Sequence, residues 1–178
     1  MLRFFDMIEA EKHKLLEAYD LYADAIYRHC YFRVFRKELA EELMQDTFMR
    51  AWEYMGNGNK IDNVRAFLYK IANNLIIDYS RKKKEESLEG MLENSYMAEP
   101  AYAPAFSIES KLLLDEVKKY IHTLEDEYKE VLIMRYVDDL DPKDIAEVLG
   151  VSANVVSVRL NRAMKALKVN MGDKGVLA

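Results

Sequence analysis

Cysteine, proline and glycine are all scarce in this sequence. A single cysteine, Cys30, excludes a disulfide framework and a metal site built from several cysteines, which favours the reducing cytoplasm. Three prolines and six glycines in 178 residues leave few turn signals, so long helices are expected. No apolar run reaches the ~18–20 residues that span a bilayer, and the first residues lack the pattern of a signal peptide. We therefore expect no membrane insertion.

Motifs of common enzymes are also missing. The three histidines, His13, His29 and His122, lie in unrelated contexts and none has a metal-ligand spacing such as HExxH. There is no phosphate-binding loop of the GxxxxGK type, and Cys30 lies on an apolar stripe. The sequence therefore predicts no catalytic residue, no metal site, no cofactor and no small-molecule substrate, so the protein is not expected to be an enzyme.

The charge of the chain is unevenly distributed. A net charge of −5 argues by itself against a nucleic-acid-binding protein, because phosphate contacts need a basic surface. However, Lys and Arg exceed Asp and Glu by five in residues 59–84 and by four in residues 151–178, whereas residues 85–116 carry a net charge of −7. Two basic segments therefore lie in an acidic chain, and each can act as a separate local field.

The hydrophobic pattern predicts helices on both sides of a linker. Apolar residues at steps of three and four run through most of the first 84 residues and return after residue 108. Residues 85–108 are acidic, contain Pro100 and Pro104 and show no clean period, which is typical of a partly flexible linker. We predict an all-α fold of two helical modules joined by a flexible acidic linker, with boundaries at 1–84, 85–108 and 109–170 and a tail at 171–178.

Residues 141–167 carry the sharpest local signal. Asp141 suits a helix N-cap, Pro142 suits the first helical position, and Gly150 suits a tight turn before a second helix that Ser152 can cap. That second helix is basic and free of acidic residues, which predicts a helix-turn-helix that enters the major groove. An ordinary helical hairpin with a solvated basic face is the alternative. The candidate DNA contacts here are Ser157, Val158, Arg159, Asn161, Arg162 and Lys165.

Two segments of the first module resemble a known family. The stretches ELAEELMQDTFMRAW (38–52) and FLYKIANNLIIDYSRKKK (67–84) resemble region two of bacterial sigma factors, most of all the extracytoplasmic-function (ECF) group, and residues 128–168 resemble region four. The resemblance implies a subunit that binds core RNA polymerase, through the β′ clamp helices and the β flap, and directs it to promoter DNA. Region two would recognise and melt the minus-ten element, and region four would read the minus-thirty-five element. A partner anti-sigma factor is expected as well.

The resemblance assigns a polymerase-binding surface to the first of these stretches. Glu42, Gln45, Asp46 and Arg50 fall at helical spacing on one face. Spacing alone favours a solvated acidic face, and the resemblance reverses that preference. In the family this face docks on the clamp helices of the β′ subunit, where carboxylates would meet basic side chains.

The second stretch supplies candidate DNA contacts. The resemblance makes Asn74, rather than its neighbour Asn73, the better candidate for holding a base extruded from the non-template strand. A polar surface or capping role is the alternative for these amides. Lys70, Arg81, Lys82, Lys83 and Lys84 are expected to bind phosphates. Among the aromatic residues, Trp52 and Phe67 are expected to be structural, whereas Tyr69 and Tyr79 are left open between core packing and stacking on bases.

The proposed recognition helix departs from the family pattern. Val155, Ser157 and Val158 stand where close relatives usually have threonine, a basic residue and serine, and Met164 also replaces a basic residue. Each missing cation removes a possible contact to phosphate or guanine, while Val158 is suited to a thymine methyl group. We therefore expect an altered minus-thirty-five preference. The competing hypothesis is a two-module helix-turn-helix regulator that binds DNA and recruits no polymerase.

Overall fold

The computed structural model describes residues 2–89, 119–121 and 123–171, and every regular element in these ranges is a helix. The chain divides into two compact units, Met1–Ala98 (unit 1) and Glu99–Ala178 (unit 2). The predicted all-α class is therefore confirmed for the described residues. Most of the predicted linker, and the start of the second predicted module, lie outside them.

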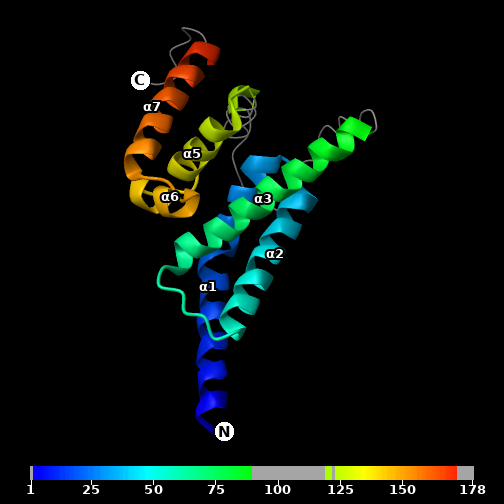
Figure 1. The fold of residues 1–178 in the computed structure, drawn as a ribbon, viewed down its shortest axis with the longest axis vertical. Coiled ribbons are helices and arrows are strands. Elements are labelled where there is room, and N and C mark those ends of the chain that lie inside the picture. The colour runs from blue at the N-terminus through cyan, green and yellow to red at the C-terminus, as the bar shows by residue number, and fades with distance from the viewer. Residues whose placement is uncertain (1, 90–118, 122, 172–178) are drawn as a thin grey trace, which may run out of the picture. The chain divides into compact units, whose positions relative to one another are not determined.

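Unit 1 is a bundle of three long helices, α1 (Leu2–Val34), α2 (Lys37–Gly56) and α3 (Val64–Glu89), and each of them packs against the other two (Figure 1). Fully buried side chains from all three helices form its core, including Ile26, Ala40 and Leu68. The N-terminal end of α1 extends beyond the ends of α2 and α3 (Figure 1). Leu16, an apolar residue of α1, is exposed.

The helices of unit 1 are joined by short connections. Phe35, between α1 and α2, adopts a left-handed backbone with φ 52°. Between α2 and α3 the chain turns after Gly56, and there the Asn59 Nδ2 atom donates a 3.0 Å hydrogen bond to the Tyr54 carbonyl oxygen. Asn63 begins α3, since its Oδ1 atom accepts a hydrogen bond from the Ala66 backbone N–H at 3.1 Å. At its other end α3 continues to Glu89, five residues beyond the predicted boundary at residue 84.

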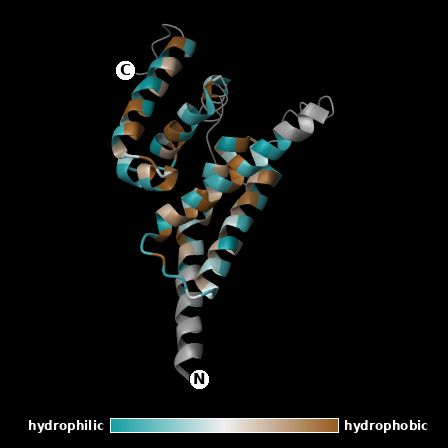
Figure 2. Ribbon diagram, viewed as in Figure 1, coloured by the Kyte–Doolittle hydropathy of each residue, from teal (hydrophilic) through white to brown (hydrophobic). Residues whose placement is uncertain are grey.

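Unit 2 contains helical residues at 119–121, followed by α5 (Asp126–Tyr136), α6 (Pro142–Leu149) and α7 (Ala153–Met171). The last helix packs against both α5 and α6, and its Val156 and Ala163 side chains are fully buried. Polar and apolar residues alternate around these helices, as Figure 2 shows. The alternation leaves one face of α7 for the core and the other for solvent.

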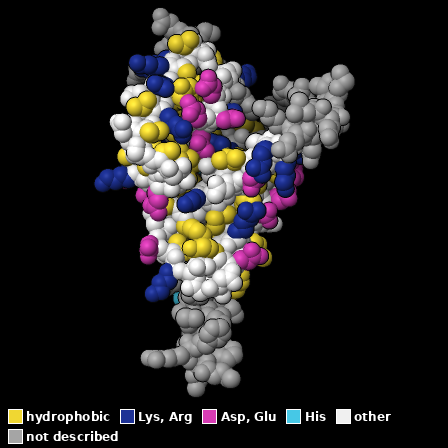
Figure 3. Space-filling view, in the orientation of Figure 1, with side chains coloured by type: hydrophobic (Ala, Val, Ile, Leu, Met, Phe, Trp, Pro, Cys, Tyr) yellow, Lys and Arg dark blue, Asp and Glu magenta, His cyan; other side chains and the backbone are white. Residues whose placement is uncertain are grey.

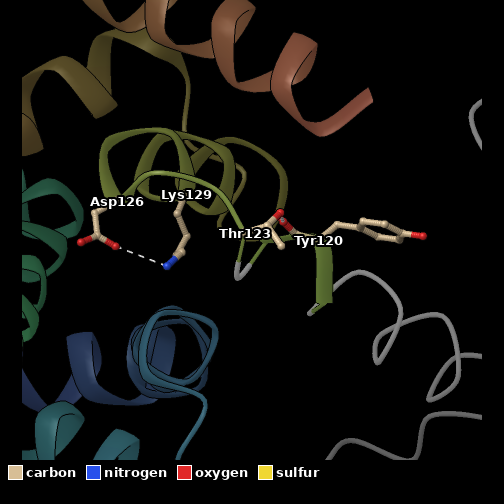
Figure 4. A network of polar contacts seen from close by, with 4 residues as sticks. All are labelled: Tyr120, Thr123, Asp126 and Lys129. Carbon is tan, nitrogen blue, oxygen red and sulfur yellow. Dashed lines mark hydrogen bonds and ion pairs between the residues drawn. The ribbon is translucent and has the colours of Figure 1, made fainter. Parts of the chain in front are cut away.

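Polar contacts fix the turn before α5 (Figure 4), and a further hydrogen bond connects this turn to α7. The Thr123 hydroxyl donates to the Tyr120 carbonyl oxygen at 2.7 Å, and Lys129 pairs with Asp126 at 3.3 Å. The Asn170 side chain donates to the Thr123 Oγ1 atom at 2.7 Å. The C-terminal part of α7 is thus hydrogen-bonded to the turn before α5.

Candidate functional site

The helix-turn-helix is built by caps that the sequence predicts. Asp141 is the N-cap of α6, and its Oδ1 atom accepts hydrogen bonds from the backbone N–H groups of Lys143 (2.8 Å) and Asp144 (2.9 Å). Gly150 ends α6 with φ 66°, a conformation that glycine adopts at little cost. Ser152 then accepts a hydrogen bond from the Val155 backbone N–H at 3.3 Å at the start of α7. The predicted α6–turn–α7 arrangement is confirmed.

The capping bonds also affect the acidity of Asp141. The N–H groups of Asp144 and Lys143 stabilise the ionised carboxylate, and they hold its pKa below the usual range for aspartate. Nearby positive charge from Lys143 and Arg135 acts in the same direction. The start of α6 is therefore held by an ionised cap at neutral pH.

The outer face of α7 brings together four of the predicted DNA contacts. Val158, Asn161, Arg162 and Lys165 are all exposed, and their spacing of three, four and seven residues places them on one side of the helix. The buried side chains of α7 lie on its opposite side. This face has the composition expected of a helix that meets DNA, because it is basic and contains short amides that can contact base edges.

Two other predicted DNA contacts, Ser157 and Arg159, already interact with residues of unit 2. The Ser157 hydroxyl donates to the Ala153 carbonyl oxygen of the preceding turn at 3.0 Å. Arg159 extends toward α5 and pairs with Glu127 at 3.2 Å, so that only 27% of its side chain is exposed. Both residues stay predicted DNA contacts, but their polar atoms already have intramolecular partners, and Arg159 flanks the outer face rather than lying on it.

The predicted polymerase-binding residues share the exposed face of α2. Glu42, Gln45, Asp46 and Arg50 are all exposed, while the opposite side of the helix packs into the bundle. Sequence reasoning missed the exposed Met49, which lies within this set, seven residues after Glu42. Helical spacing places Met49 on this face, but an apolar residue in an amphipathic helix is ordinarily predicted to be buried in the core. The surface thus combines charge with an apolar centre.

On α3, three of the predicted DNA contacts form a line. Lys70, Asn74 and Arg81 are exposed at steps of four and seven residues. The exposed Ile77, which sequence reasoning did not single out, lies between Asn74 and Arg81 on the same line. Arg81 also pairs with Asp78 at 3.2 Å. We refer to these four residues as the α3 line: Lys70, Asn74, Ile77 and Arg81.

Asn73 does not join the α3 line. It is only 3% exposed, because it lies one residue away from Asn74 and therefore faces the bundle. In this position its amide cannot reach a base edge, which corrects its prediction as a DNA contact. Lys82 and Lys83 are exposed, but their helical positions lie on other sides of α3. Lys and Arg side chains gather over the C-terminal half of this helix (Figure 3).

The aromatic side chains of unit 1 differ in their accessibility. Tyr69 is fully buried against His29, with ring centroids 5.2 Å apart, so it is a core residue. Phe67 is half-buried and packs on Tyr54. The half-buried Tyr79 accepts a 3.0 Å hydrogen bond from Arg36. The remaining aromatic residue at issue, Trp52 on α2, is exposed, contrary to the expectation that it packs in the core.

Neither a metal site nor a membrane span is found in the part of the chain that the structure describes. Within the described ranges, no group of three or more His, Cys, Asp or Glu side chains is arranged to hold a metal ion. The helices searched in the same ranges are all too short or too polar to cross a bilayer. Three exposed helix faces are candidate sites, those of α2 and α3 in unit 1 and that of α7 in unit 2.

Comparison with known proteins matches both units. Residues 18–86 match the family described as Sigma-70 region 2, and residues 114–167 match the family described as Sigma-70, region 4. Among solved structures, the sigma factor RpoE in complex with the anti-sigma factor NepR from Bartonella quintana has a similar fold, with a TM-score of 0.72 and 21% identity over 90% of this chain and 98% of that one. CnrH, in complex with the cytosolic domain of CnrY, has a TM-score of 0.69 and 19% identity over 93% of this chain and 92% of that chain.

Curated relatives extend across both units and the segment between them. The ECF RNA polymerase sigma factor SigM of Bacillus subtilis (strain 168) is 35% identical over 90% of this chain and 96% of its own length. SigW, an ECF RNA polymerase sigma factor of the same organism, is 30% identical over 86% of this chain and 87% of its own length. The alternative of a regulator that recruits no polymerase is not favoured. This chain belongs to the family of ECF RNA polymerase sigma factors.

Proposed function

We propose that this sigma factor divides promoter-directed initiation among three exposed helix faces. The face of α2 binds core RNA polymerase, the α3 line contacts the melted non-template strand, and the outer face of α7 reads the upstream promoter element. Membership of the family is the observation that carries the proposal. In this role the chain is a non-catalytic subunit that works in the cytoplasm, where core polymerase and DNA are found.

The α2 face suits a protein partner. Its carboxylates, Glu42 and Asp46, are four residues apart on one side of the helix, and the exposed Met49 lies beside them. A partner with basic side chains around an apolar contact would complement this pattern, and the clamp helices of the polymerase β′ subunit have that role in the family. An apolar centre surrounded by charge is also the usual anatomy of a specific interface.

The α3 line suits single-stranded DNA. Lys70 and Arg81 lie about 16 Å apart along the helix, from eleven residues at 1.5 Å each, and both can bind phosphates. Between them, Asn74 offers an amide that can pair with a base edge. We assign the capture of one extruded base to Asn74, with Ile77 against its sugar or ring.

Unit 2 has two proposed partners. The outer face of α7 enters the major groove of the minus-thirty-five element, where Arg162 and Lys165 contact guanine or phosphate. The β flap of the polymerase is the expected protein partner of the same unit. An anti-sigma factor is proposed as well, since the sigma factor RpoE, which shares this fold, is seen in complex with the anti-sigma factor NepR. Such a partner would cover the α2 face and its apolar side chains Met49 and Trp52.

Reconstitution with purified core polymerase tests the proposal. The chain should form a stable complex with core and support run-off transcription from promoters selected out of a random library. Reversing the charge of Glu42 and Asp46 together to lysine should abolish the complex, because like charges would then meet at the clamp. Asp62→Lys is the matched control, since this exposed carboxylate lies in the loop before α3. Specific DNA binding by the free chain, with no association with core, would overturn the proposal.

A further inference from the structure

We propose that Val155 and Val158 of α7 recognise thymine methyl groups in the upstream promoter element, so that the chain reads part of this element by apolar contact. The inference rests on the proposed function of α7 as the helix that enters the major groove. It identifies the chemistry that α7 selects: A·T pairs whose C5-methyl groups face the two valines.

The first observation is that both valines are exposed. Val155 keeps 38% of its surface accessible and Val158 keeps 40%. They are three residues apart, so their side chains lie next to each other on the helix surface. A β-branched residue is a poor choice for a solvent-exposed helix position, because its side chain loses rotamer freedom there. Neither helix propensity nor core packing therefore accounts for this pair.

The second observation is their position among the polar residues of the helix. Val158 follows the exposed Asn154 by four residues and precedes Asn161 and Arg162 by three and four. It thus lies at the centre of the outer face, inside a ring of amides and one guanidinium. The helix has no acidic residue, so nothing on it repels phosphates. A helix docked through its basic side chains would bring the valines toward the base edges rather than the backbone.

The third observation is that other candidate readers in this part of α7 are occupied. The Ser157 hydroxyl is bonded to the preceding turn, and Arg159 is paired with Glu127. In helix-turn-helix proteins the N-terminal part of the second helix contacts base edges. Beside Ala153 and the back-bonded Ser157, the exposed side chains there are Asn154, Val155 and Val158. The thymine methyl is the apolar group that base pairs present in the major groove, so it is the natural partner for valine.

Removing single methyl groups from the DNA tests this contact. A promoter is first selected by the wild-type holoenzyme from a library randomised upstream of the start site. Each thymine of its upstream element, on either strand, is then replaced in turn by deoxyuridine, which removes the methyl group and keeps every hydrogen-bonding group. Open-complex formation is measured for holoenzymes that carry the wild-type chain, Val155→Ala, Val158→Ala or Val169→Ala. Val169 is the matched control, because it is 79% exposed on the same helix but eleven residues, about 16 Å, beyond Val158.

We expect one or two thymine positions at which deoxyuridine lowers open-complex formation about three- to fourfold with the wild-type chain, the effect of withdrawing one buried methyl. At each of those positions the effect of the substitution should disappear in the variant that lacks the contacting valine, Val155→Ala or Val158→Ala, while Val169→Ala should behave like the wild type. The inference is overturned if the selected element contains no thymine, if deoxyuridine has no effect anywhere, or if its effect persists in both valine variants.

Two further outcomes separate the possible causes of failure. If Val155→Ala and Val158→Ala weaken binding to core polymerase in the absence of DNA, the valines form a protein contact and the inference is wrong. If the wild-type chain supports no selected promoter at all, the proposed function fails, and the inference fails with it. Promoters that are selected and transcribed but insensitive to deoxyuridine overturn the inference alone.

Discussion

Replacing Asn74 by alanine should improve folding and impair promoter opening. Asn74 is exposed in the middle of α3, where alanine is the better helix former by roughly 0.5 kcal/mol. The variant should therefore unfold at a slightly higher urea concentration. If the amide holds an extruded base through a bidentate contact worth about 1–3 kcal/mol, its loss lowers the equilibrium for opening by roughly 5- to 150-fold. Stability and function should thus change in opposite directions.

Permanganate reactivity of unpaired promoter thymines measures the opening, and binding of the holoenzyme to the closed duplex should change much less. Ser80→Ala is the control, because Ser80 is exposed on the same helix and lies outside the α3 line. An unchanged permanganate footprint for Asn74→Ala would refute the assigned role. An equal effect of Ser80→Ala would show that the loss comes from the helix as a whole.

Further predictions concern unit 2. Arg162→Ala should reduce transcription about fivefold or more on promoters with an intact upstream element, but not on promoters whose upstream element is scrambled. Arg159→Ala should cause a smaller reduction, because Arg159 is paired with Glu127 within the unit. Protection of α6 against hydrogen exchange, taken relative to the intrinsic exchange rate at each pH, should fall below about pH 4 as the lowered pKa of Asp141 is approached from above and the ionised cap is lost. The Asp141→Asn variant should lack this component. In a urea titration, Gly150→Ala should lower the free energy of unfolding by about 1–2 kcal/mol. The cause would be the left-handed backbone of Gly150 alone, since no atom lies within 4 Å of the added Cβ. The control, Gly56→Ala, has equally open space and no positive φ, so it should be neutral or stabilising.

Local features of the sequence were sufficient to predict the helix-turn-helix. An N-cap aspartate, a proline at the first helical position and a glycine after the last turn each act within a few residues, so their effect does not depend on the rest of the fold. Asp141, Pro142 and Gly150 accordingly occupy the predicted positions. The all-α class followed from the same kind of evidence, because the three- and four-residue period is also local.

Features that depend on contacts between helices could not be predicted in this way. The position of Arg159 depends on Glu127, which lies 32 residues earlier on α5. Which of Asn73 and Asn74 faces the core depends on how α3 is rotated against α1 and α2, and one residue changes that direction by about 100°. The end of α3 was placed too early for another reason. A change in the sign of the charge at residue 85 suggested a linker, but the glutamates that follow are good helix formers.

The two basic helices of an acidic chain make most sense as contacts that act together. Each helix alone offers few cations, and a net charge of −5 opposes the approach of the whole chain to DNA. Once core polymerase holds the chain beside a promoter, each further contact becomes intramolecular, and avidity can exceed the single affinities by about 10²–10⁴. Weak reading by α7 is then sufficient, and its discrimination can rest on small terms such as single methyl groups. Changes on α7 should therefore alter which promoters are used, whereas changes on the α2 face should remove promoter-directed transcription altogether.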